Sequence, residues 1–247
     1  MPYEPYAPLN QLKPLAENIW IVDGPVVDMN YMGLFHLPFP TRMTVIRLAD
    51  RRLVLHSPTE LSDDLVGEIW ELGEVAYLVS PNRIHYVHLN DWAKAFPNAQ
   101  VWAAPGMRDQ QPGVTVGHIF EQDGFPDWGD EIECFVVHGG YMAEVEFFHR
   151  PSRSLILTDL IENFEEQRVE GAALKLAMRC GGVMAPDGSL PRDLRLTFAG
   201  RYRAGLEAAV TAMVARAPER VIIAHGQGFD QAATERLRQS FDWLLSA

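Results

Sequence analysis

The sequence predicts an α/β fold, an αββα sandwich in which two mixed β-sheets pack together and helices cover their outer faces. Short apolar strand patterns alternate with helical patterns along the chain, which is typical of layered α/β folds. A β-rich segment followed by a helical segment also occurs twice. The chain has 247 residues, of which 47% are hydrophobic and 22% charged, enough for a full core. We therefore expect one domain over residues 1–247, with the proline-rich residues 1–15 as a surface strap.

In the first half, apolar runs predict strands at residues 18–23, 41–48, 53–56, 76–80 and 100–103. The polar segment 49–52 is typical of a hairpin turn between the second and third of these strands. Helices are expected at 57–72 and 89–96, with Ser57 or Thr59 as the N-cap of the first. Residues 24–40 are rich in glycine and proline and predict a loop. Its apolar side chains suit a lid or partner contact as well as simple packing; they are Met29, Tyr31, Met32, Leu34 and Phe35.

In the second half, strands are expected at residues 132–138, 144–149, 154–158 and 220–224. Helical patterns cover 161–182, 203–216 and 231–245. The helix at 203–216 is strongly amphipathic, with one apolar face made of Leu206, Val210, Met213 and Val214. These elements complete the second half of the predicted sandwich.

Charge and composition exclude several classes of function. The net charge of −12 disfavours nucleic acid, whose binding depends on neutralising phosphates with Lys and Arg, and it weakens a case for anionic membranes. No run of 18 apolar residues or signal-peptide pattern occurs, so we expect a cytoplasmic protein. Cys134 and Cys180 form no C-x-x-C unit, which excludes a thiolate zinc site of that kind. A small-molecule ligand is the expected partner, and a homo-oligomer is left open.

Polar residues follow the predicted strands abruptly. Ser80-Pro-Asn82-Arg-Ile-His85 begins as the strand 76–80 ends, and His138 ends the strand 132–138. Asp159 follows the strand 154–158, and His225 follows the strand 220–224. Functional groups in α/β folds gather at such strand ends. Four such ends on one edge would form a site of Asn, His, Asp and His.

These runs resemble motifs of the metallo-β-lactamase superfamily. Asp159-Leu160 and His225-Gly226 resemble two late motifs of that family, which supply a bridging carboxylate and a final histidine. Residues 80–85 fall where the family carries H-x-H-x-D-H. The resemblance extends over most of the chain and is nearest to an uncharacterised bacterial branch of unknown function. The runs that carry it are Pro40-Thr-Arg-Met-Thr44, Ser80-Pro-Asn-Arg-Ile-His85, Phe148-His-Arg-Pro-Ser-Arg-Ser154, Leu157-Thr-Asp-Leu-Ile161 and Ala224-His-Gly226.

The resemblance implies a two-metal site that this chain has largely rewritten. Ser80 and Asn82 replace the first two histidines of the motif, and Ile84 replaces its aspartate. The family's middle histidine falls near Gly140, where none is present. Because serine and amide oxygens bind zinc poorly, we expect the first half-site to be empty. His85, Asp159 and His225 remain, and two histidines with a carboxylate suffice for one divalent metal such as Zn, Mn or Fe.

Two functions stay open at this point. The first is a metal-dependent hydrolase with His85, Asp159 and His225 as its metal-binding and catalytic residues. The second is a metal-free, non-catalytic protein that binds a small molecule or a protein partner, with the same three residues forming a hydrogen-bonded cluster. Candidate substrate-binding residues surround the predicted site, and His56, at the end of the strand 53–56, is a candidate supporting residue. The substrate-binding candidates are Asn82, Arg83, Arg42, Glu144 and His138.

Overall fold

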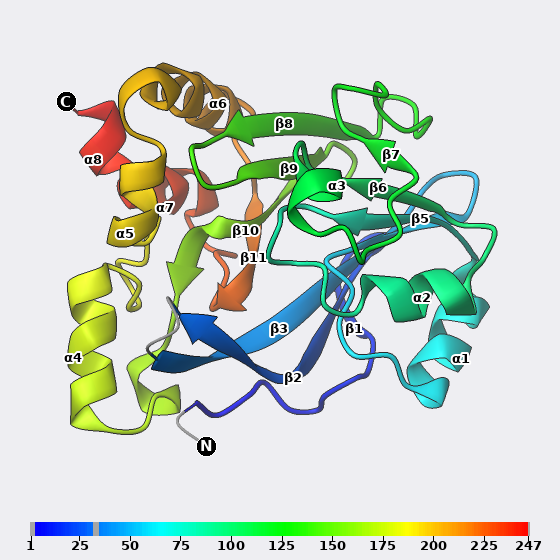
Figure 1. Ribbon diagram of the computed structural model, residues 1–247, viewed down its shortest axis with the longest axis horizontal. Coiled ribbons are helices and arrows are strands. Elements are labelled where there is room, and N and C mark those ends of the chain that lie inside the picture. The colour runs from blue at the N-terminus through cyan, green and yellow to red at the C-terminus, as the bar shows by residue number, and fades with distance from the viewer. Residues whose placement is uncertain (1–2, 32–34, 247) are drawn as a thin grey trace.

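The computed structural model describes residues 3–31 and 35–246 and confirms the αββα architecture (Figure 1). Within this part of the chain, one sheet has the strand order β1-β2-β3-β4-β5-β6-β7 and the other has the order β11-β10-β9-β8. The first sheet consists of β1 (Lys13–Ala16), β2 (Ile19–Tyr31), β3 (Phe35–Arg47), β4 (Arg52–His56), β5 (Glu74–Ser80), β6 (Gln100–Ala103) and β7 (His118–Ile119). The second consists of β8 (Ile132–His138), β9 (Ala143–His149), β10 (Ser154–Asn163) and β11 (Arg220–Gly226).

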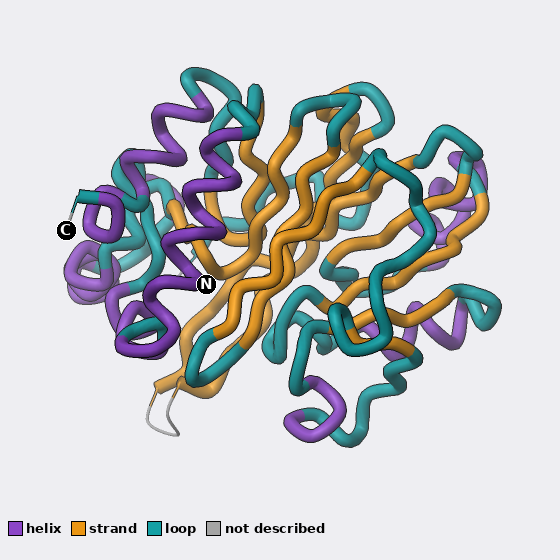
Figure 2. The backbone as a smooth tube through the Cα atoms, turned by 90° about the horizontal axis from the view of Figure 1, so that it is seen from above, coloured by secondary structure: helices purple, strands orange, loops and turns teal. Residues whose placement is uncertain are grey.

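The helices are divided between the outer faces of the two sheets, as Figures 1 and 2 show. The helices α1 (Asp63–Leu72), α2 (Leu89–Ala95) and α3 (Met107–Gln110) belong to the first half. The second half contributes α4 (Ala172–Gly181), α5 (Arg192–Thr197), α6 (Arg203–Ala215), α7 (Ala233–Ser240) and α8 (Asp242–Leu245). None of the helices in residues 3–31 and 35–246 is long and apolar enough to cross a membrane.

Strand alternation separates the core into layers. In β3, Met43 and Val45 pack against α1 and α2, whereas Ile46 faces the second sheet. Val145 and Phe147 of β9 meet Ile46 in the layer between the sheets. The outer face of the second sheet is covered by α6, whose four predicted apolar residues are all buried. The predicted amphipathic helix is therefore confirmed.

The predicted loop at residues 24–40 is wrong, because this segment forms the long β2–β3 hairpin. Proline lacks the N–H that a sheet ladder needs and is tolerated only at bulges and free edges. Pro25 lies at a bulge between Gly24 and Val26. Pro38 and Pro40 lie in the half of β3 that has a free edge, since β4 pairs only with residues 44–47 of that strand. Met32 and Leu34 lie outside the described residues, as do the side chains of Met29, Tyr31 and Phe35, so the proposed lid contact stays a prediction.

Two helix boundaries also differ from expectation. The helix predicted over 57–72 begins at Asp63, and its cap is Ser62, whose hydroxyl accepts the backbone N–H of Leu65. Ser57 cannot start a helix because its backbone lies in the left-handed region with φ of 55°. The helix predicted over 161–182 begins only at Ala172, because β10 continues to Asn163 alongside β11. The closing helix 231–245 is divided into α7 and α8.

His149, at the end of β9, is fully buried, and its Nε2 has no hydrogen-bond partner. Burial lowers the pKa of His149 to about 4. The unfolded chain, with a pKa near 6.5, therefore takes up this proton first as the pH falls. We expect the free energy of unfolding to decrease between pH 6.5 and pH 4 by up to about 3 kcal/mol for this group, and to be unaffected by it above pH 6.5. Urea denaturation at pH 7.5 and 4.5 should show a smaller loss in H149N than in the wild type, and an equal loss would contradict this assignment.

Candidate functional site

Three side chains predicted from separate strand ends meet at one edge of the sandwich. The Nε2 atoms of His85 and His225 lie 3.1 Å apart. Asp159 Oδ2 lies 3.2 Å from His85 Nε2, and Asp159 Oδ1 lies 3.2 Å from His225 Nε2. His85 comes from the loop after β5, Asp159 from β10 and His225 from β11. The side chains are only 5–7% exposed, so the cluster is buried.

Hydrogen bonds at the far side of each ring orient the two histidines. His225 Nδ1 lies 2.8 Å from the carbonyl oxygen of Pro40. A carbonyl only accepts, so Nδ1 carries a proton, and Nε2 is directed at Asp159. His85 Nδ1 lies 2.6 Å from Ser57 Oγ. This pattern, with one ring nitrogen tied to a protein oxygen and the other directed inward, is typical of histidines that bind metals.

The electrostatics of the cluster show that it needs positive charge. Burial opposes ionisation of Asp159, but His85 and His225 outweigh it and hold the pKa of Asp159 well below its usual range. Burial also opposes the charged form of His85, and the carboxylates of Asp159 and Glu144 outweigh it and raise the pKa of His85. The two Nε2 atoms and the ionised carboxylate face one another, so either protons on the imidazoles or a cation must lie among these atoms.

The residues present fit a divalent metal. The two Nε2 atoms lie 3.1 Å apart, and each lies 3.2 Å from one of the two oxygens of Asp159. These spacings suit ligands bound to one ion at about 2.0–2.2 Å. Within the described residues, His85, Asp159 and His225 form the one group of His, Cys, Asp and Glu side chains arranged to share an ion. Two imidazoles and a carboxylate are a common ligand set for zinc and iron. The donor set alone does not distinguish among Zn, Mn and Fe.

Asn82 and Glu144 lie beside this cluster and are both fully buried. Asn82 Nδ2 donates to Asp159 Oδ2 at 2.6 Å and to Glu144 Oε2 at 2.9 Å. Glu144 Oε1 accepts the backbone N–H groups of Thr158, Asp159 and Leu160. Both were expected to bind substrate, but their polar atoms are engaged within the protein. Ser80, the other residue in place of a family histidine, directs its hydroxyl to the carbonyls of Asn82 and His85.

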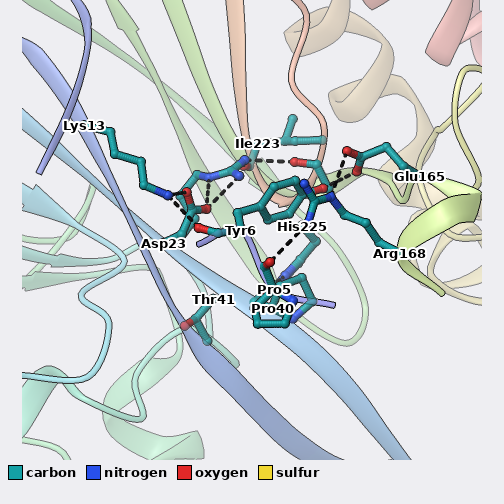
Figure 3. Close-up of polar contacts among 12 residues, drawn as sticks. Pro5, Tyr6, Lys13, Asp23, Pro40, Thr41, Glu165, Arg168, Ile223 and His225 are labelled. Atoms are coloured by element: carbon teal, nitrogen blue, oxygen red, sulfur yellow. Dashed lines mark hydrogen bonds and ion pairs between the residues drawn. The ribbon is translucent and has the colours of Figure 1, made fainter. Parts of the chain in front are cut away.

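Arg42, another expected substrate-binding residue, is 8% exposed. Its guanidinium pairs with Asp23 at 2.7–2.8 Å, and Asp23 also pairs with Lys13 at 2.8 Å (Figure 3). Arg42 Nη1 donates to the carbonyl oxygens of Ile223 and Gly226 at 2.8 Å each. Arg42 therefore joins β3 to β11 on either side of His225, with four of its five N–H groups bonded within the protein.

The N-terminal strap packs against the same corner. Tyr6 lies between the guanidinium groups of Arg42 and Arg168, at 4.9 and 4.1 Å from its ring centroid, and its hydroxyl donates to Glu165 (Figure 3). Tyr3 is buried against Phe164 with the ring centroids 5.5 Å apart. The strap is thus anchored by aromatic contacts more firmly than its proline content alone indicates.

The remaining candidates occupy different places. Arg83 donates to the carbonyl of Tyr141 at 3.1 Å and lies over its ring. His138 is half-exposed and pairs with Glu121 at 2.7 Å, so the structure does not bring it to the cluster. His56 is buried against Phe147, and burial with the nearby His85 lowers its pKa to about 3.

Sequence reasoning missed two partners of the histidines. Ser57 was considered as a helix cap, yet it follows β4 directly and bonds His85 instead. Its position as a polar residue after a strand is the same signal that identified Asp159 and His225. The Pro40 carbonyl is a backbone group, and nothing in the side-chain sequence indicates that it would bind His225.

A family model described as a domain of unknown function, DUF4336, matches residues 17–183 of the chain. The chain belongs to the DUF4336 family. No curated protein matches it. The match covers β2 to α4 and thus includes His85 and Asp159, whereas His225 lies beyond it.

Solved metallo-β-lactamases share the fold of this DUF4336 protein. The enzyme from Pontibacter korlensis is 14% identical, with 94% of this chain and 98% of that chain covered and a TM-score of 0.58. FIM-1 from Pseudomonas aeruginosa, in a mono-zinc form, is 14% identical over 94% and 95% of the two chains, with a TM-score of 0.56. DIM-1 is 14% identical over 96% of each chain, with a TM-score of 0.61. These likenesses establish the metallo-β-lactamase-like fold that the sequence motifs predicted.

Proposed function

We propose that this DUF4336 protein is a hydrolase that holds one divalent metal ion with His85, Asp159 and His225. The observation that carries the proposal is the convergence of two imidazole nitrogens and an ionised carboxylate within 3.1–3.2 Å of one another. The tautomer of His225, fixed by Pro40, leaves its Nε2 free to coordinate. FIM-1, a structural neighbour, is known in a mono-zinc form, so a protein of this fold can hold a single ion.

In this function, the chain's own residues divide the work. Asp159 supplies negative charge and orients a water molecule. Ser57 and Pro40 hold the two rings so that their Nε2 atoms face the same point. A divalent metal bound there would supply Lewis acidity toward a carbonyl or phosphoryl oxygen. We expect the substrate to be a small molecule.

Metal analysis of the purified protein tests this proposal. We expect the wild type to bind one equivalent of Zn²⁺, Mn²⁺ or Fe²⁺ with micromolar or tighter affinity in isothermal titration calorimetry. H85A, D159N and H225A should each lose at least about tenfold in affinity, because each removes a direct ligand. H138A is the matched control, because His138 is half-exposed and pairs with Glu121. The H138A protein should bind metal like the wild type. Absence of binding by the wild type, or unchanged affinity in the three variants, would overturn the proposal.

One observation favours a second candidate, a metal-free protein that binds a small molecule or protein partner. Asn82 Nδ2 donates to Asp159 Oδ2 at 2.6 Å, and this short hydrogen bond already satisfies part of the carboxylate that a metal would use. In that case protons shared by His85 and His225 would neutralise Asp159. The same titration separates the candidates, because the metal-free protein would take up no ion while D159N would still alter its thermal stability.

A further inference from the structure

The first half-site, which the resemblance implies and this chain has rewritten, is filled by hydrogen bonds among protein side chains. Asn82 stands at the place of a family histidine, and its side chain is 0% exposed. Its Oδ1 accepts the backbone N–H groups of Ile84 and His85 at 2.8 and 3.1 Å. Its Nδ2 reaches Asp159, Glu144 and Thr158 Oγ1 at 2.6, 2.9 and 3.2 Å. The amide of Asn82 thus fixes both the backbone at His85 and one carboxylate oxygen of Asp159.

Glu144 fixes Asp159 from the backbone side. Strand β10 departs from β11 at this point, where residues 158–161 lie opposite the single residue Ala224. The pairing of β10 with β9 also ends at Ile156, so the N–H groups of residues 158–160 have no ladder partner in either neighbouring strand. Glu144 Oε1 accepts all three, at 3.1, 2.8 and 3.1 Å. A buried carboxylate with this many N–H donors is well satisfied without a metal ion.

Glu146 completes the arrangement. It is fully buried two residues along β9 from Glu144. Burial, followed by the neighbouring Glu144 carboxylate, raises the pKa of Glu146 well above its usual range.

We propose that Asn82 and Glu144 are positioning residues that take the place of a second metal ion and hold Asp159 and His85 for a single one. The proposal rests on the metal site described above. It follows from the hydrogen bonds to Asp159 and Glu144. The side-chain amide of Asn82 and three backbone N–H groups donate to these carboxylates, and thereby stabilise them where a second cation would otherwise be required. The centre is therefore built for one ion, not for two with one missing.

Cobalt(II) alone serves as the probe, because its visible absorption reports the geometry of its ligands. The wild type should bind one equivalent. N82A and E144Q should each weaken Co²⁺ binding by about 10–100-fold, the range found when supports of metal ligands are removed, and should change the absorption bands. E144Q keeps an oxygen for the three backbone N–H groups but directs its own NH₂ at that of Asn82, so it tests the charge without removing the acceptor. Thermal denaturation of the metal-free variants checks that they fold.

The matched control is E133Q. Glu133 lies on β8 opposite Phe148 and pairs with Arg150 and Arg216, at 2.9 and 2.6 Å, away from the cluster. The same change from carboxylate to amide should therefore leave Co²⁺ affinity and spectrum unchanged. Folded N82A and E144Q proteins with wild-type affinity and spectrum would reduce these residues to a structural role and overturn the proposal. Binding of two Co²⁺ ions by the wild type would overturn it as well.

The imidazole ¹⁵N resonances of His85 and His225 provide a readout that needs no metal. In the metal-free protein, N82A and E144Q should shift both pairs of resonances, and E133Q should not. If the wild type binds no Co²⁺, the proposed function fails, and these spectra alone then decide whether Asn82 and Glu144 hold the imidazoles. Unshifted resonances would overturn the positioning role independently.

Discussion

Replacing Arg42 with alanine should lower the free energy of unfolding by about 3–5 kcal/mol, the cost of breaking a buried ion pair by removing one partner. Asp23 is only 3% exposed and would keep Lys13 as its single charged neighbour. The carbonyl oxygens of Ile223 and Gly226 would lose the donor that each now has. These carbonyls flank His225, so R42A should also weaken metal binding. Urea denaturation and calorimetry measure the two effects.

Arg179 provides the matched control for Arg42. It pairs with Glu166 at 2.6 Å, but both side chains are about half exposed, and such surface pairs contribute about 0–1 kcal/mol. R179A should therefore have a small effect. R42K should fall between the wild type and R42A, because lysine keeps the charge but not the planar set of donors that reaches Asp23 and both carbonyls. An R42A protein as stable as R179A would show that Arg42 does not hold β3 to β11.

The cluster of His85, Asp159 and His225 could be predicted from the sequence because of a simple rule of α/β folds. Asp159 and His225 each follow an apolar run, within β10 and β11, and His85 follows β5, so placing the strands in one sandwich brings the three side chains to one edge. Strand ends are visible in the sequence as abrupt changes from apolar to polar residues. The family resemblance pointed to the same three residues.

The roles of the neighbouring residues could not be predicted in the same way. A polar residue near a site can face the substrate or the protein, and this depends on contacts distant in sequence. Arg42 finds its acceptors more than 180 residues away, and Asn82 finds Glu144 62 residues away. The strand pairing of residues 24–40 was hidden because prolines at a bulge and at a free edge look the same in sequence as prolines in a loop. The distinction requires the neighbouring strands to be known.

Gly226 illustrates a constraint that is equally invisible in the sequence and has a large expected effect. Its φ is 102°, and a Cβ at this position would lie 2.1 Å from the carbonyl oxygen of Asn163 and 2.4 Å from its carbon. Both contacts are backbone, so no side chain can move aside. We expect G226A to lose about 2–5 kcal/mol of stability from the strained backbone and the overlap combined. Because His225 precedes it directly, the displaced backbone should also move the imidazole and lower metal affinity.

Gly67 in α1 is the matched control for Gly226, since a Cβ there would contact nothing within 4 Å. In a helix interior alanine is preferred over glycine, so G67A should stabilise the protein by about 0.5–1 kcal/mol and leave metal binding unchanged. Opposite signs for the same chemical change would establish that the effect of G226A arises from its backbone and from the approach of Asn163. If G226A is as stable as the wild type and binds metal normally, β10 and β11 are less closely apposed at the cluster than the structure shows. The support that Arg42 gives through the Gly226 carbonyl would then have to be reconsidered too, because both depend on the position of this one peptide.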